Sequence, residues 1–199
     1  HPALAVPELM RILVDEHHVE WDTAWDLCQR IFSYTNHTLM SEALETWPVE
    51  LMGRLLPRHL RIIYDLNARF LAEVHDRFPE ESELLRRISL IDESGQRRVR
   101  MAYISVLASH KINGVSALHS QLMVETIFAD FARLWPERFN NKTNGITPRR
   151  WLSQANRPLS ALIDARIGTT WRRHLDELSA LRALADDTEF QSAFRLAKA

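Results

Sequence analysis

The fold of this chain is decided by the stretch PRHLRIIYDLNARFLAEVHDRF, residues 57–78. Its apolar residues recur at three- and four-residue intervals from Leu60 to Val74, and Asn67 occupies one position of that stripe. Such spacing gives a helix one apolar face. A proline begins the stretch and Pro79 follows it, which is where prolines are tolerated around a helix. We therefore predict one long amphipathic helix that organises the core.

Shorter helices are expected on both sides of it. Each shows apolar residues at helical spacing and is bounded by proline, glycine or polar clusters. The polar cluster Ser33–Thr38 is expected to be a loop. In the first part of the chain, helices are expected from Pro7 to about His17, from near Asp22 to that loop, from Pro48, and from Val115 to Leu134. A loop or short strand is expected from Phe139. Beyond it, one helix should begin at Pro148, and three more helical stretches should follow, with breaks near Pro158, Gly168 and Asp186-Asp187.

The hydrophobic period changes between residues 88 and 108. A short apolar run ends at Ile91, turn residues follow over Asp92–Gly95, and apolar residues then alternate before Ile104–Ala108 becomes continuously apolar. We predict an exposed, arginine-rich hairpin whose second arm becomes a strand in the middle of a sheet. Ser109–Gly114 is expected to be a polar connection.

The resulting fold class is mainly α with one or two strands. So few strands cannot form a stable sheet of their own, because a two-stranded sheet is marginal in water. We therefore expect them to belong to a larger sheet whose other strands lie outside this segment. The chain opens at His1-Pro2-Ala3 without Met and closes on a helical pattern with no stop signal, so an internal segment of a longer protein is expected.

Composition indicates a folded globular protein. The 199 residues are 46% hydrophobic and 26% charged, and the formal net charge of -1 gives no positive field for nucleic acid or an anionic membrane. We find no run of about 18 apolar residues that would span a bilayer. The single cysteine, Cys28, lies on an apolar helical face with Trp21 and Trp25 and is expected to be buried, which fits a reducing cytoplasm.

Metal and nucleotide sites have no sequence support. The nine histidines include the doublet His17-His18, but adjacent helical residues point about 100° apart and are poorly arranged around one ion. Neither a His-Glu-x-x-His nor a Cys-x-x-Cys pattern occurs, and the five glycines form no phosphate-binding loop. We expect no metal, and Cys28 carries no signature of a nucleophile.

Neutral polar side chains gather in the loops between apolar elements. Amide and imidazole groups suit neutral sugars, because they hydrogen-bond hydroxyl groups without the desolvation cost of a charge. The same residues often satisfy the backbone of turns instead, and spacing leaves both interpretations open. The set comprises Asn36, His37, Asn113, Asn140, Asn141 and Asn144.

Five motifs in these loops carry a family resemblance. They are His1–Ala5, Tyr34–Thr38 with Glu42–Glu45, Leu56–His59, Asn113–His119, and Lys142-Thr-Asn-Gly-Ile-Thr-Pro-Arg-Arg-Trp151. In this order and spacing they resemble the glycogen and maltodextrin (alpha-glucan) phosphorylase family, and the bacterial type most closely. The ten-residue motif is specific by itself. Ser41 stands where many members have proline.

The resemblance implies a parent α/β enzyme with two Rossmann-like lobes, similar to the type B glycosyltransferases. Residues 1–145 would complete the first, glucan-side lobe, and residues 146–199 would cross into the second, cofactor-side lobe. The implied reaction is phosphorolysis of terminal alpha-1,4-linked glucose by inorganic phosphate to give glucose 1-phosphate. Family members are cytoplasmic homodimers that use pyridoxal 5'-phosphate.

Site residues follow from the matched motifs. His37 is implied as the catalytic residue and, with His1 and Asn144, as a sugar ligand. Asn113, Val115, His119 and Trp151 match the positions beside the cofactor. The lysine that holds pyridoxal phosphate lies beyond residue 199, so the segment alone is expected to be inactive.

The composition by itself also permits a second hypothesis, a helical binding or regulatory module without catalysis. A longer reading frame with a basic cluster and a cofactor lysine would distinguish the two. Preference for glycogen or for maltodextrin is left open.

Overall fold

The computed structural model describes residues 2–199. The chain divides into two compact units: the N-terminal unit ends at Thr143, and the C-terminal unit runs from Asn144 to Ala199. Helices predominate in both, which confirms the mainly helical class. Within residues 2–199, no helix combines the length and apolar character needed to cross a bilayer.

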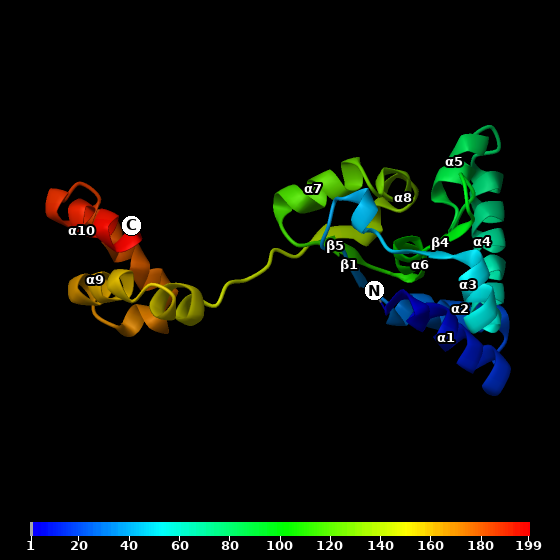
Figure 1. Ribbon diagram of the computed structural model, residues 1–199, viewed down its shortest axis with the longest axis horizontal. Coiled ribbons are helices and arrows are strands. Elements are labelled where there is room, and N and C mark those ends of the chain that lie inside the picture. Colours follow the sequence, from blue (N-terminus) through cyan, green and yellow to red (C-terminus); the bar gives the residue numbers. More distant parts are fainter. Residues whose placement is uncertain (1) are drawn as a thin grey trace. The chain divides into compact units, whose positions relative to one another are not determined.

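The longest helix of the N-terminal unit is α4 (Pro57–Arg77), which confirms the predicted long helix. The helix begins with Pro57 in its first turn and buries Leu60, Ile63, Phe70 and Val74. It packs against α1, α3 and α5, and Figure 1 shows it along one end of the unit. The other helices of this unit are η1 (Pro2–Leu4), α1 (Ala5–Arg11), η2 (Ile12–Glu16), α2 (Trp21–Ile31), η3 (Ser41–Ala43), α3 (Val49–Leu55), α5 (Ser82–Ile88), α6 (Met101–Ala108), α7 (Ala117–Glu125), α8 (Ala129–Leu134) and η4 (Pro136–Arg138).

Two three-stranded sheets complete the unit, so the expectation of one or two strands was too low. The first is parallel with the order β1-β5-β6, and the second is antiparallel with the order β2-β4-β3. Strands of two or three residues are too short to show alternation in a sequence. They are β1 (Tyr34–Thr35), β5 (Ile112–Gly114) and β6 (Phe139–Asn141), and β2 (Thr46–Pro48), β4 (Arg98–Arg100) and β3 (Ile91–Asp92).

The predicted central strand over Ile104–Ala108 is wrong, because Met101–Ala108 forms helix α6. Six of its eight residues are buried, so almost every side of the helix faces other protein. A helix buried on all sides reads as a continuous apolar run, which periodicity cannot separate from a central strand. The polar connection expected after it is also partly wrong, since it contains strand β5.

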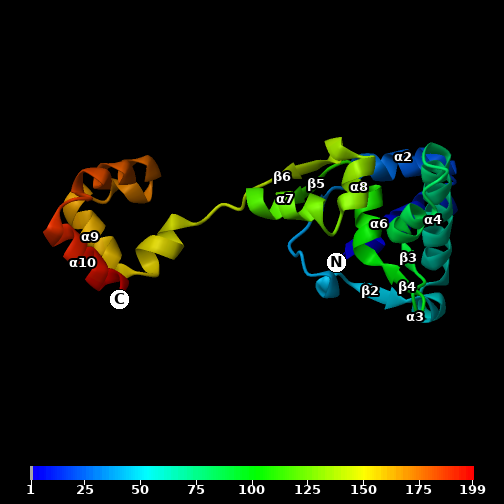
Figure 2. The same cartoon turned by 90° about the horizontal axis from the view of Figure 1, so that it is seen from above.

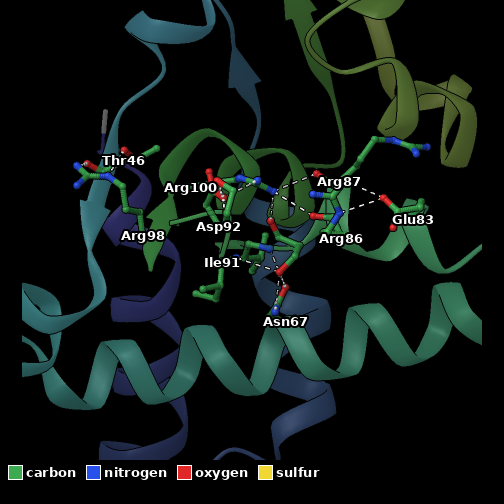
Figure 3. A network of polar contacts seen from close by, with 12 residues as sticks. Thr46, Asn67, Glu83, Arg86, Arg87, Ile91, Asp92, Arg98 and Arg100 are labelled. Carbon is green, nitrogen blue, oxygen red and sulfur yellow. Dashed lines mark hydrogen bonds and ion pairs between the residues drawn. The ribbon is translucent and has the colours of Figure 1, made fainter. Parts of the chain in front are cut away.

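Polar side chains attach the antiparallel sheet to α4 and α5 (Figure 3). Asn67, buried on α4, accepts the Leu90 N–H at 2.8 Å and donates to Ser89 Oγ at 3.2 Å. Arg100 of β4 donates to the carbonyl oxygens of Arg87 and Ser89 at 3.1 Å each, where α5 ends. These carbonyls lack partners within the helix, so the arginine acts as a C-terminal cap. The predicted hairpin is confirmed, but its Arg100 is bound rather than exposed.

An aromatic cluster fills the core between α4, α6, α8 and β1. Phe131 lies at its centre, with ring centroids 4.9 Å from Tyr103, 6.1 Å from Phe70 and 6.2 Å from Trp135. Such rings bury large apolar areas and prefer these separations. The cluster therefore joins segments far apart in sequence into one core.

The C-terminal unit contains η5 (Arg149–Gln154), α9 (Arg157–Ile167), η6 (Thr170–Arg172), η7 (Leu175–Leu184) and α10 (Thr188–Lys198). Leu159, Ile163 and Trp171 form its core. Asn156 caps α9 by accepting the Leu159 N–H at 2.9 Å and also donates to Ala197 O at 2.8 Å, which ties α9 to the end of α10. Gly168 follows α9 with a positive φ of 80°, so the predicted break there is confirmed.

Candidate functional site

The three parallel strands of the N-terminal unit end at one edge of their sheet, in which Figure 2 shows β5 and β6. Asn36 and His37 follow β1, Val115 follows β5, and Lys142 follows β6. The Asn36 N–H still donates to Asn113 O at 2.9 Å, so the end of β1 remains attached to β5. Ligands of parallel sheets bind beyond the carboxyl ends of the strands. The fold thus brings His37, Asn113 and Val115 together at the edge of the sheet that favours ligand binding.

His37 lies on the turn that follows β1 and is exposed. It lines a cavity of about 290 Å³ beside β1, together with Tyr34, Ser105 and Ser109. A neutral imidazole carries one hydrogen-bond donor and one acceptor, and each serine hydroxyl can both donate and accept. The lining is uncharged and combines these polar groups with the apolar side chains of Pro2, Ala3 and Phe32, a mixture that suits a neutral sugar.

The connection from β5 to α7 is unusually close. A Cβ atom on Gly114 would lie 2.6 Å from His119 Nδ1 and 2.8 Å from Ser120 Cα, so only glycine fits without movement. Ser116 then caps α7 by accepting the His119 N–H at 3.2 Å. The beginning of α7, where the helix dipole is partly positive, is thus held close to the end of β5.

His119 extends from α7 back to this connection. Its Nδ1 accepts the Val115 N–H at 3.2 Å, so in the neutral ring the proton is on Nε2. Nε2 is buried and has no hydrogen-bond partner within residues 2–199. Buried donors rarely lack a partner. The atom is suited to an acceptor that this part of the chain does not supply.

The asparagines at this edge mainly hold the sheet together. Asn113 accepts from Thr35 Oγ1 at 2.9 Å and donates to Gly114 O at 3.0 Å. Asn141 accepts from Ser120 Oγ at 3.0 Å and donates to Thr143 Oγ1 at 3.0 Å. The contacts of Asn113 and Asn141 therefore favour the interpretation that these side chains support the backbone rather than bind a sugar. Asn140 differs, because its Oδ1 is buried without a partner among the described residues.

The other two candidates belong to the C-terminal unit. Asn144 is exposed and lies in the segment before η5. Trp151 is 68% exposed, and its main-chain N–H donates to Thr147 O at 2.9 Å at the beginning of η5. An indole so exposed is uncommon on a protein surface and leaves a flat aromatic face accessible. His1 lies outside the described residues.

Comparison with known proteins gives one consistent result. The family model of the carbohydrate phosphorylases matches residues 1–199. The chain is 56% identical to the glycogen phosphorylase of Haemophilus influenzae over 97% of its length, and 56% identical to that of Synechocystis over 96%. It is 51% identical to the muscle form of human glycogen phosphorylase over 96%. The aligned part covers 24%, 22% and 23% of these relatives, so the chain spans about a quarter of their length.

Proposed function

Because this chain belongs to the carbohydrate phosphorylase family, we propose that it is part of a glycogen phosphorylase and carries residues that bind the terminal glucosyl unit. The observation that supports this most directly is the gathering of His37, Asn113 and Val115 at the carboxyl edge of a parallel sheet. The family match favours this function over the alternative, a helical module without catalysis.

The proposed reaction is phosphorolysis of glycogen or maltodextrin. The bond between C1 of the terminal glucose and the bridging oxygen breaks, and C1 forms a bond to an oxygen of inorganic phosphate. The proton of inorganic phosphate passes to the bridging oxygen, which stays on the shortened glucan as its new terminal hydroxyl, and glucose 1-phosphate is released. Atoms and charges balance without an oxidant or a reductant.

His37 and Asn144 are proposed to hydrogen-bond the primary hydroxyl of the glucosyl unit, and His1 is proposed to line the same site. His37 is exposed and lines an uncharged cavity, where its imidazole can accept from or donate to a hydroxyl group. Neutral partners are suitable because the sugar carries no charge that would offset the desolvation of an ion. Orientation of the sugar then brings C1 to the attacking phosphate.

Pyridoxal 5'-phosphate is the proposed cofactor, and the residues fit such a group. The buried His119 Nε2 can donate to an acceptor atom, and the Trp151 indole offers an accessible flat face. Asn113 and Val115 would shape the wall beside it. When bound, this cofactor supplies a phosphate group that exchanges a proton with the substrate phosphate. The lysine that holds it is proposed to lie outside this segment.

The whole enzyme is proposed to be a cytoplasmic homodimer with two lobes. Residues 1–145 would complete the first lobe and residues 146–199 would begin the second.

Purified full-length enzyme tests the function. Incubated with glycogen and inorganic phosphate, it should release glucose 1-phosphate, whereas residues 1–199 expressed alone should release none. Release of free glucose by the full-length enzyme would instead indicate hydrolysis and contradict the proposal.

A further inference from the structure

Asn36, the residue before His37, is one of the few polar residues that the N-terminal unit buries completely. Its exposed fraction is 0%, whereas its neighbours Thr35 and His37 are exposed. An amide buried in this way is costly unless its donor and acceptor groups both have partners. The contacts of Asn36 therefore indicate what its burial achieves.

Both groups of the Asn36 side chain are bonded. Oδ1 accepts the Thr38 N–H at 3.2 Å, which closes a turn around the intervening residue, His37. Nδ2 donates to the hydroxyl of Tyr34 at 3.2 Å. With its backbone N–H on Asn113 O, Asn36 holds this turn to the sheet and to a core side chain.

Tyr34, which accepts a hydrogen bond from the Asn36 side chain, is itself held in place by the core. It is 7% exposed, and its ring packs edge-on against Phe128 with centroids 6.2 Å apart. Burial raises the pKa of Tyr34, so its hydroxyl group is uncharged at neutral pH, and its oxygen accepts from the Asn36 amide. A loop that is bonded to such a packed ring holds its residues in better-defined positions than a loop that is held by backbone contacts alone.

We propose that Asn36 is a positioning residue that fixes His37 and thereby sets the selectivity for sugars that carry a primary hydroxyl group. The inference rests on the proposed function, because it takes His37 to bind that hydroxyl. Asn36 itself does not touch the sugar. It acts through the turn of which it forms the first residue.

The test compares two donors in the direction of glucan synthesis. The full-length enzyme receives glucose 1-phosphate or 6-deoxyglucose 1-phosphate with a maltooligosaccharide primer, and kcat/KM is measured for each. A site built around a hydroxyl group discriminates against the analogue that lacks it. Asn36→Ala should lower the preference for glucose 1-phosphate about fivefold to tenfold by loss of one well-placed hydrogen bond. The 6-deoxy donor should be nearly unaffected.

Two further variants separate positioning from general stability. Tyr34→Phe keeps the packed ring but removes the hydroxyl group, so a smaller loss of preference, about threefold, is expected even if Asn36→Ala fails to fold. Asn67→Ala is the matched control, since it removes another buried amide of the same unit, which bonds Leu90 in the α5–β3 connection. It should lower the melting temperature and leave the preference unchanged.

The outcomes are distinct. An unchanged preference in Asn36→Ala and Tyr34→Phe overturns the inference, as does an equal loss in Asn67→Ala. If the unsubstituted enzyme makes no distinction between the two donors, the assigned role of His37 is wrong and the inference fails with it. If the enzyme uses neither donor, the proposed function itself is contradicted.

Discussion

His119 Nδ1 accepts the main-chain N–H of Val115 at 3.2 Å, across the tight connection between β5 and α7. The bond commits one ring nitrogen to the protein backbone and leaves the proton on the other, buried nitrogen. One side chain thus both shapes the connection and offers a donor at the carboxyl edge of the sheet.

We expect His119→Ala to lower both stability and cofactor retention. The Val115 N–H loses its acceptor, which should cost about 1–2 kcal/mol in the free energy of unfolding. In the full-length enzyme, the cofactor absorbance that remains after dialysis should fall relative to the unsubstituted protein. Leu118→Ala, at the exposed neighbouring position, is the control and should change neither. Full cofactor retention in His119→Ala would argue against the proposed contact.

Gly114→Ala should be destabilising because its Cβ would press on His119 Nδ1 at 2.6 Å and on Ser120 Cα at 2.8 Å. The start of α7 would have to move, at a cost of about 1–3 kcal/mol as in overpacked cores. Urea unfolding of the full-length enzyme measures the change. At Gly95 an added Cβ would meet no atom of the described residues within 4 Å, so Gly95→Ala should be close to neutral. Equal stability of the two variants would show that the connection is not tightly packed.

His37→Ala and Asn144→Ala should each lower phosphorolysis by the full-length enzyme. If each residue contributes a hydrogen bond that strengthens in the transition state, the rate should fall about tenfold to a hundredfold or more. Cofactor content should be unchanged, and initial rates of glucose 1-phosphate release give the effect. Normal kinetics in stable, folded variants would exclude these two residues from the sugar site.

Cys28→Ala should leave activity unchanged and reduce stability. Cys28 is fully buried on α2, and burial raises the pKa of its thiol to about 11, so it is uncharged and a poor nucleophile at neutral pH. Its loss leaves a small cavity, for which we expect about 1–2 kcal/mol in the free energy of unfolding. Calorimetry and a phosphorolysis assay together provide the check. An inactive but folded variant would mean that the thiol takes part in the chemistry.

The carboxylate of Glu8 should make stability depend on acid pH. Arg11 and His59, whose nitrogens lie 2.8 and 2.7 Å from Glu8 Oε2, help to lower the pKa of Glu8 from 4.5 to about 2. A lowered folded pKa means that its contribution is complete above about pH 4.5 and is lost as the pH falls towards 2.

Melting temperatures of the unsubstituted protein and Glu8→Gln should therefore differ near pH 6 and converge as the pH is lowered. Glu50→Gln, at an exposed position of α3, is the control and should follow the unsubstituted protein at every pH. A difference between Glu8→Gln and the unsubstituted protein that persists at pH 2 would show that the carboxylate does not act through its charge.

Long helices with one apolar face were predictable from the sequence, whereas most of the short strands outside the β3–β4 hairpin were not. α4 combines a regular stripe with prolines at both boundaries, so local information suffices for it. Asn67 on the same stripe is buried because it bonds the backbone of Leu90, a distant contact that no periodicity reveals. The helix α6 was mistaken for a strand because burial on all sides removes the periodic signal.

The sequence by itself determined the family, through motifs that persist in order and spacing, and it identified the loops that carry the candidate site. Only the tertiary structure decided that the segments after β1 and β5 meet at one edge, that Asn113 is used to hold the strands, and that His119 leaves a buried donor without a partner among residues 2–199. The physical reason is that strand pairing and burial depend on contacts between segments far apart in the chain, whereas a motif or a helical stripe is a local property.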